Sequence, residues 1–227
     1  MRPLTTWGRI TVLVPLSPSP VLAATEDAVA STLMDVAVVD YTAPDAAERF
    51  TDSLRETGFG VIVNHPLEWS LVEQVDTEWS ALFDDRAVSK YHSQDMIGGY
   101  VPPTMSETAK GFEVPDLKEF FHVYPWSVYP TEVSDAALRY REAAREVALT
   151  LLGWVDQQTP PEVAARLSRP LARMMDGSTR TLLRILRYPP LPQRIPEGAV
   201  RAAAHEDINL LTVLPASDEP GLELLGT

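Results

Sequence analysis

The chain has 227 residues, enough for one large domain or for a domain with an accessory segment. Its 32 acidic and 19 basic residues give a net charge of −13, which opposes binding to nucleic acids and to anionic membrane surfaces. Because the chain has no cysteine, disulfides and thiolate metal sites are excluded, and any metal must be bound by His, Asp or Glu.

The first 33 residues differ in composition from the rest of the chain. A basic residue, a short apolar run and small residues resemble a secretory signal, but Pro15, Pro18 and Pro20 interrupt the run. The run is also too short to span a membrane. We favour the alternative, a disordered leader over residues 1–33 that adds nothing to the fold. The domain then starts near Met34, in a protein that we expect to be cytoplasmic.

Strands and helices alternate in the next part of the sequence. The β-branched run at 36–41 predicts a strand, and the segment that follows predicts a helix with Pro44 near its first turn and Gly58 just past its end. Another strand follows at 59–65. The segment 68–85 has apolar residues three and four apart, which predicts a helix with one buried face.

The middle of the chain becomes helical and its end returns to strands. Gly, Pro and polar residues predict that 97–116 is mostly loop, and the apolar run at 117–126 predicts a strand. A long helix is predicted over 131–158, followed by a second helix from the Pro160–Pro161 pair through Met174. The remaining apolar runs predict strands at 179–192, 208–215 and 221–225.

A histidine and an aspartate two residues apart are the candidate functional residues. If residues 205–207 lie on a strand, His205 and Asp207 point to the same face while Glu206 points away. An imidazole and a carboxylate on one face can supply two ligands of a 2-His-1-carboxylate iron site. The pair alone is weak evidence, since two polar residues at a surface strand end give the same pattern.

Four motifs in order make the case stronger. The stretches VVDYTAPDAAERFTDSLRETGFGVIVNH, GGYVPPTMSETAKG, DLKEFFHV and RILRYPPLP followed by AAAHEDINLLTVLP and PGLEL are found between residue 38 and residue 224. Together they resemble the isopenicillin N synthase-like, 2-oxoglutarate/Fe(II)-dependent oxygenases. The resemblance extends from about Val36 to the end of the sequence.

This resemblance implies an α+β fold, with a double-stranded β-helix (jelly roll) and a helical N-terminal region. The N-terminal region of the family would cover residues 34–176, and the first part of the jelly roll would cover 177–227. The implied cofactors are Fe(II), bound by His205 and Asp207, and the cosubstrate 2-oxoglutarate. Tyr188 matches a tyrosine that reaches a carboxylate of the cosubstrate or substrate, although a core tyrosine is equally compatible with the sequence. The implied partners are a small-molecule substrate and O₂.

The sequence also departs from the family pattern. The family adds a second histidine and an arginine beyond the aspartate, but this sequence has no His after 205 and no Lys or Arg after 201. His65, His92 and His122 are expected to be structural or surface residues. We therefore expect a jelly roll truncated at the C-terminus, an impaired oxygenase, and strand edges that favour aggregation.

Two alternatives to an oxygenase remain open at this stage. One is a non-catalytic binding or structural remnant of the fold that uses an exposed strand edge to pair with another chain. The other is a non-enzymatic jelly roll that binds a metal. Arg184 and Arg187, three apart on one predicted strand, should face opposite sides, and either side could be the pocket.

Overall fold

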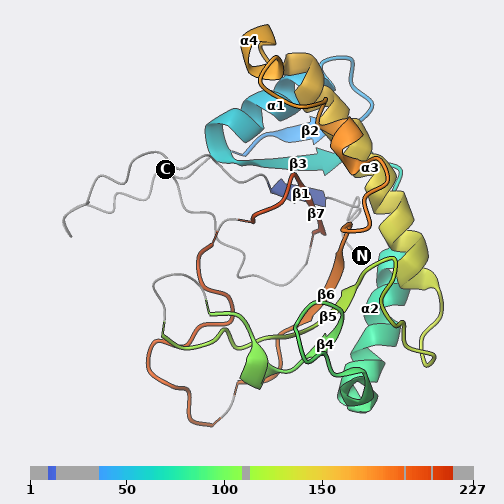
Figure 1. Cartoon of the computed structure of the whole chain (residues 1–227), viewed down its shortest axis with the longest axis vertical. Coiled ribbons are helices and arrows are strands. Elements are labelled where there is room, and N and C mark those ends of the chain that lie inside the picture. The colour runs from blue at the N-terminus through green and yellow to red at the C-terminus, as the bar shows by residue number, and fades with distance from the viewer. Residues whose placement is uncertain (1–9, 14–35, 109–112, 192, 206, 217–227) are drawn as a thin grey trace, which may run out of the picture. The chain divides into compact units, whose positions relative to one another are not determined.

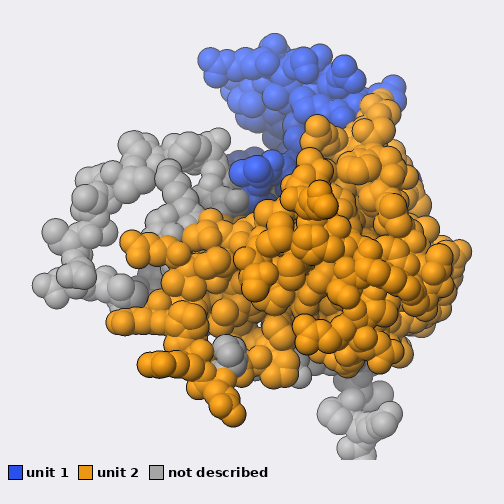
Figure 2. Space-filling model, turned by 60° about the horizontal axis from the view of Figure 1, so that its bottom comes forward, with its two compact units in different colours: residues 1–67, 146–174, 206–227 blue, residues 68–145, 175–205 orange. Residues whose placement is uncertain are grey.

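The computed structural model describes residues 10–13, 36–108, 113–191, 193–205 and 207–216. The chain forms two compact units, and neither is continuous in sequence (Figures 1 and 2). The first unit contains residues 1–67, 146–174 and 206–227, and the second contains 68–145 and 175–205. The predicted boundary at residues 176 and 177 does not separate these units, because strands from both sides of it pair in the second unit.

The first unit contains a four-stranded sheet with the strand order β2-β3-β1-β7. Its strands are β1 (Ile10–Leu13), β2 (Val38–Asp40), β3 (Phe59–Val63) and β7 (Thr212–Pro215). The predicted helix is α1 (Ala46–Thr57), which ends at Gly58 in the left-handed conformation with its N–H bonded to the Leu54 carbonyl. The strand β2 is parallel to β3, and β1 is antiparallel to both β3 and β7.

Aromatic rings fill the space beside this sheet. Phe50 of α1 is fully buried and contacts Trp154 of α3 (Ala136–Gln158) with the rings edge to face. A side chain at Gly60 of β3 would meet the Phe50 ring at 3.0 Å, so the strand and the helix approach closely at this glycine. The part of α3 after Arg145 belongs to this unit, and the part before it belongs to the second.

The strand β1 lies inside the segment that we expected to be a disordered leader. Its backbone pairs with β3 from Ile10 opposite Ile62 to Leu13 opposite Phe59, and with β7 on its other side. Three consecutive β-branched residues in ITVL favour such a strand. The rest of residues 1–33 lies outside the described residues, so the role of that segment as a leader stays a prediction.

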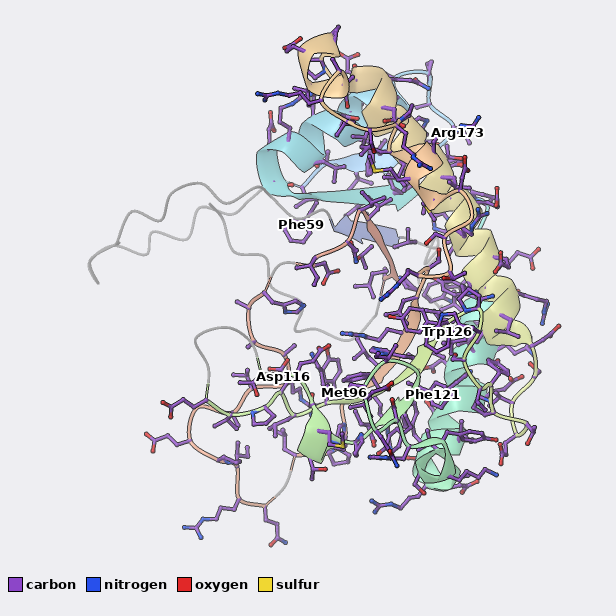
Figure 3. All side chains as sticks on the ribbon, in the orientation of Figure 1. Phe59, Met96, Asp116, Phe121, Trp126 and Arg173 are labelled. Atoms are coloured by element: carbon purple, nitrogen blue, oxygen red, sulfur yellow. The ribbon has the colours of Figure 1, made fainter. Side chains whose placement is uncertain are left out.

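The second unit contains a three-stranded antiparallel sheet with the order β4-β5-β6. The strands are β4 (Gly99–Val101), β5 (Glu119–Val123) and β6 (Leu183–Arg187). The helix α2 (Trp69–Asp84) packs on one face, where Trp79, Phe121 and their neighbours form the core cluster. Figure 3 shows Phe121 next to α2 and Asp116 farther from that helix.

One prediction about regular structure was wrong. The helix predicted from Pro161 through Met174 is only α4 (Pro161–Ala164), followed by a 3-10 turn, η3 (Ala172–Met175). Pro170 is incompatible with the predicted continuation of this helix, because a proline disfavours helical geometry in the residue before it. The described part of 97–116 is mostly loop, as predicted, and also contains β4 and a 3-10 turn, η2 (Pro103–Met105). The 3-10 turn η1 (Ala87–Tyr91) was not predicted, and the predicted strand at 221–225 lies outside the described residues.

We predict that Trp79→Ala destabilises the second unit by about 3–5 kcal/mol, because truncating a buried aromatic side chain leaves a cavity. Trp79 is 1% exposed and contacts the rings of Phe121 and Tyr129. The matched control is Trp126→Ala, since Trp126 is 56% exposed in the same unit. Urea denaturation should show a much smaller loss for Trp126, and equal losses would contradict this assignment of the core.

A chain that begins at Met34 tests the role of β1. Because β1 pairs on both sides, its removal leaves β3 and β7 with unpaired backbone groups, and the first unit should lose stability. The expected result is a lower melting temperature than that of the full chain. If the two chains melt at the same temperature, the strand adds nothing to the fold and the leader interpretation holds.

Candidate metal centre

His205 belongs to the second unit, and its ring is oriented by the backbone. Its Nδ1 lies 2.8 Å from the carbonyl oxygen of Ala203. Since a carbonyl oxygen only accepts hydrogen bonds, Nδ1 carries the proton, and in the neutral ring Nε2 holds the lone pair. Metal-binding histidines commonly donate one ring nitrogen to a backbone carbonyl in this way, which fixes the tautomer and the orientation of the ring.

Asp207 belongs to the first unit and is held by its own neighbours. The hydroxyl group of Thr212, at the start of β7, donates a hydrogen bond to Asp207 Oδ2. The side-chain amide of Asn209 donates in turn to the Thr212 hydroxyl over 2.9 Å. These contacts orient a half-buried carboxylate oxygen, which is the kind of donor that the candidate iron site needs.

The prediction that His205 and Asp207 lie on a strand was wrong. Both residues are in irregular backbone, and the strand β7 begins only at Thr212. Ile208 between them and β7 is fully exposed, so the apolar run does not pack from its first residue. Each donor is therefore fixed by its local hydrogen bonds and not by the alternation of a strand.

The donor chemistry of these two residues fits iron, with one imidazole and one carboxylate. Among the described residues, no group of three His, Asp or Glu side chains is placed to bind a metal ion. The predicted ligand pair therefore has no third protein ligand in the described part of the chain. Two donors are compatible with a 2-His-1-carboxylate site that needs one more histidine.

Tyr188 follows β6 directly and is 43% exposed. The guanidinium group of Arg201 lies 5.9 Å from the centre of the Tyr188 ring and also donates to the Pro189 carbonyl. Tyr188 is thus not a core residue, and its position beside a cation is compatible with binding a carboxylate. Which carboxylate it contacts stays a prediction.

The two arginines of β6 do face opposite sides of the sheet. Arg187 pairs with Glu119 and Asp84 on the α2 side, and its guanidinium group lies 5.9 Å from the Phe83 ring. Arg184 lies on the other side, where it forms two hydrogen bonds to Glu107 and one to His122. Alternation along the strand, as predicted, accounts for this difference.

A network of charged and polar residues on the face away from α2 was missed by the sequence analysis. It consists of Glu107, Asp116, Lys118, His122 and Arg184, joined by hydrogen bonds and ion pairs. Asp116 and Lys118 are 3% and 4% exposed, which is rare for charged side chains that are not paired. Alternation along DLKEFFHV could have indicated that His122 and Phe120 face away from the core. The contact of His122 with Arg184, 62 residues later, could not be inferred from the sequence.

His122 is a structural histidine, as the sequence suggested. Its Nδ1 lies 3.1 Å from the Met96 carbonyl and 3.2 Å from that of Ile97, and its Nε2 accepts a hydrogen bond from Arg184 Nε. Burial, and then the positive charge of Arg184, hold its pKa below the ordinary value. Both ring nitrogens are therefore engaged in the neutral form.

Glu107 completes the electrostatics of this network. Burial alone would raise the pKa of its carboxyl group, but the charges and hydrogen bonds of Arg184 and Lys118 outweigh burial and lower it. The carboxylate is therefore ionised and balances two cations.

A separate hollow of about 380 Å³ in the same unit is lined by Lys90, Tyr91, His92, Asp95, Gly98, Gly99, Trp126, Ser127 and Val128.

Comparison with known proteins places the chain in a family. Residues 33–143 match the family model described as "non-haem dioxygenase in morphine synthesis N-terminal". A solved structure from Shewanella oneidensis, assigned as an oxygenase, is 48% identical, with a TM-score of 0.72 over 83% of this chain and 68% of that one. The chain belongs to the isopenicillin N synthase-like, 2-oxoglutarate/Fe(II)-dependent oxygenases. The likeness to oxygenase structures is consistent with the expected jelly roll, although the described strands form two small sheets and no closed barrel.

Curated relatives are more distant and longer. Gibberellin 3-beta-dioxygenase 4 of Arabidopsis thaliana is 25% identical over 201 residues, which cover 83% of this chain and 56% of that protein. Flavonol synthase 3 of Arabidopsis thaliana is 26% identical over 210 residues, which cover 84% of this chain and 65% of that protein. The chain therefore spans less than two thirds of the length of either relative. Within the described residues, no helix has the length and hydropathy that crossing a membrane requires.

The pKa of His122 gives a prediction about pH. Because the folded state disfavours the protonated ring, the unfolded chain takes up that proton first, at the ordinary value of 6.5. The free energy of unfolding should therefore fall as the pH is lowered from 7 to 5. Replacing His122 with Gln, which cannot be protonated, should reduce this fall, whereas His92→Gln at an exposed site should not. Urea denaturation at several pH values measures both, and identical slopes in all three proteins would contradict the prediction.

Proposed function

We propose that this protein is a non-haem Fe(II)-dependent oxygenase that uses 2-oxoglutarate and O₂ to oxidise a small molecule. His205 and Asp207 supply two protein ligands of the iron. The observation that carries the proposal is the orientation of the His205 ring, whose Nδ1 donates to the Ala203 carbonyl, a contact that metal-binding histidines commonly make. Membership in the oxygenase family supports the same assignment.

The protein's own residues would bind and orient the reactants. The carboxylate of Asp207, oriented by Thr212, balances part of the charge of the metal. Tyr188 is proposed to donate its hydroxyl to a carboxylate of 2-oxoglutarate or of the substrate. Fe(II), when bound, supplies the activation of O₂ for substrate oxidation, which no side chain of the protein can provide.

We further propose that residues 34–176 correspond to the N-terminal region of the family and 177–227 to the first part of its jelly roll. The match of residues 33–143 to the N-terminal family model supports this division. A cytoplasmic location also stays a prediction.

Fe(II) binding tests the proposed ligands directly. The dissociation constant of the full chain, measured anaerobically by calorimetry, should rise at least about tenfold in His205→Ala and in Asp207→Ala, because each removes a donor atom. The matched control is His92→Ala, which removes an exposed histidine of the second unit outside the motif. If the His92 variant loses as much affinity as the His205 variant, the metal is bound elsewhere and the proposal fails.

Turnover by these 227 residues alone is predicted to be weak. The sequence has no His after 205 and no Lys or Arg after 201. Residues 206–227 therefore supply neither the second histidine ligand nor a cation for the distal carboxylate of 2-oxoglutarate. Succinate release in the presence of Fe(II), ascorbate, 2-oxoglutarate and O₂ should therefore be close to the background. Strong turnover that His205→Ala abolishes would show that another residue completes the site.

The alternative of a non-catalytic binding module rests on the edges of the first sheet. Among the described strands, β7 lies at one edge of this sheet and β2 at the other, where the Arg49 side chain donates to the Val38 carbonyl. An uncovered edge can pair with another chain. Sedimentation separates the two views: a monodisperse monomer that binds no Fe(II) favours the binding module, whereas aggregation relieved by fusing the next segment of a close relative favours the oxygenase.

A further inference from the structure

The segment that ends at His205 is held to the segment before β5 by two hydrogen bonds, one between backbones and one from the backbone to a side chain. The N–H of Leu117 donates to the Val200 carbonyl over 2.8 Å, and the N–H of Ala203 donates to Asp116 Oδ1 over 3.0 Å. All four residues belong to the second unit. Ala203 is 4% exposed, so water does not replace the carboxylate as the partner of its N–H.

Ala203 connects Asp116 to His205 through the two polar groups of one residue. Its N–H is bound by the Asp116 carboxylate, and its carbonyl oxygen accepts the Nδ1–H of His205 at 2.8 Å. The N–H contact fixes the position of the Ala203 backbone, and the carbonyl contact fixes the tautomer of the imidazole ring. Asp116 can therefore influence His205 without touching it.

The Asp116 carboxylate is bound at both oxygens, by Ala203 and by Lys118, and the backbone of Asp116 is also held. Lys118 Nζ lies 2.9 Å from its Oδ2, and the N–H of Asp116 donates to the Glu107 carbonyl over 3.0 Å. Lys118 lies 3.2 Å from the Glu107 carboxylate, which Arg184 binds on its other side. A buried carboxylate held in this way is a rigid acceptor, because moving it would separate buried charges.

We propose that Asp116 is a positioning residue for the metal ligand His205, acting through the backbone of Ala203. This inference rests on the proposed iron-binding role of His205, but the contact itself can be tested without metal. Its consequence is that loss of the Asp116 carboxylate releases the Ala203 amide and allows His205 to sample both neutral tautomers.

The primary test uses the metal-free full chain and NMR. In Asp116→Ala, hydrogen exchange of the Ala203 amide should accelerate by at least about tenfold. The reason is that losing a hydrogen bond to a charged acceptor favours the exchange-competent state by at least that factor. The ¹⁵N shifts of the His205 ring should move from the Nδ1-protonated form toward a mixture. Asp116→Asn keeps an acceptor oxygen and should restore part of the amide protection and of the tautomer preference.

The matched control is Asp95→Ala. Asp95 also accepts one backbone N–H, from Ile97 over 3.0 Å, and one side-chain hydroxyl, from Ser93, and both partners lie in its own loop. Exchange at Ala203 should be unchanged in this variant. If Asp116→Ala and Asp95→Ala have the same effect on Ala203, or if neither changes the His205 ring, the positioning role is overturned.

Exchange at Phe121, in the core of the same unit, separates positioning from unfolding. The role is supported if the Ala203 amide and the His205 ring change more in Asp116→Ala than in Asp116→Asn, while Phe121 stays protected in Asp116→Asn. It is overturned if protection at Phe121 falls in parallel with that at Ala203 in both Asp116 variants.

An Fe(II) titration then separates this inference from the proposed function. If the metal-free changes are observed and Fe(II) binds about tenfold more weakly to Asp116→Ala than to the natural chain, both hold. If the metal-free changes are observed but the natural chain binds no Fe(II), Asp116 still orients His205, and the iron-binding function alone fails. A weaker metal affinity without any change at Ala203 would overturn the positioning role.

Discussion

The burial of charge at Asp116 and Lys118 is the constraint on which the second unit depends. Two ionised side chains removed from water are stable only when each has partners, and both are almost fully buried. Asp116 and Lys118 pair with each other, and Asp116 also accepts a hydrogen bond from the N–H of Ala203. Lys118 pairs in addition with Glu107, which Arg184 binds on its other side. These contacts join the loop before β5, the strand β6 and the segment before His205 into one network.

The alternation of β5 explains how one short strand serves both a core and a polar face. Phe121 and Val123 point toward α2 and join the apolar cluster, whereas Phe120 and His122 point the other way, beside Arg184. Every residue of β5 is buried, so the polar side chains on both faces need partners of their own. Glu119, which receives hydrogen bonds from Tyr100 and Arg187 on the α2 side, meets the same requirement.

Local patterns predicted most of the regular elements, because hydrophobic spacing and end signals are local. Gly58 marks the end of α1, and the apolar spacing of 68–85 gives α2 almost residue for residue. The errors arose where a local pattern was incomplete: the second predicted helix ends at Ala164, well before Met174, and the apolar run after Asp207 joins a strand only from Thr212. The ligand pair was recognisable as a motif, but the Asp116–Ala203 contact was not, since it joins residues 87 positions apart.

The same contact shows that, within the second unit, the residues matched by the N-terminal family model depend on residues that follow that match. Asp116 and His122 lie within the region that matches the N-terminal family model, whereas Arg184 and Ala203 lie beyond it. Hydrogen bonds from Arg184 to His122 and from Ala203 to Asp116 cross that boundary, as does the pairing of β5 with β6. A substitution in the DLKEFFHV motif can therefore alter the backbone that holds His205, although the motif contains neither proposed iron ligand.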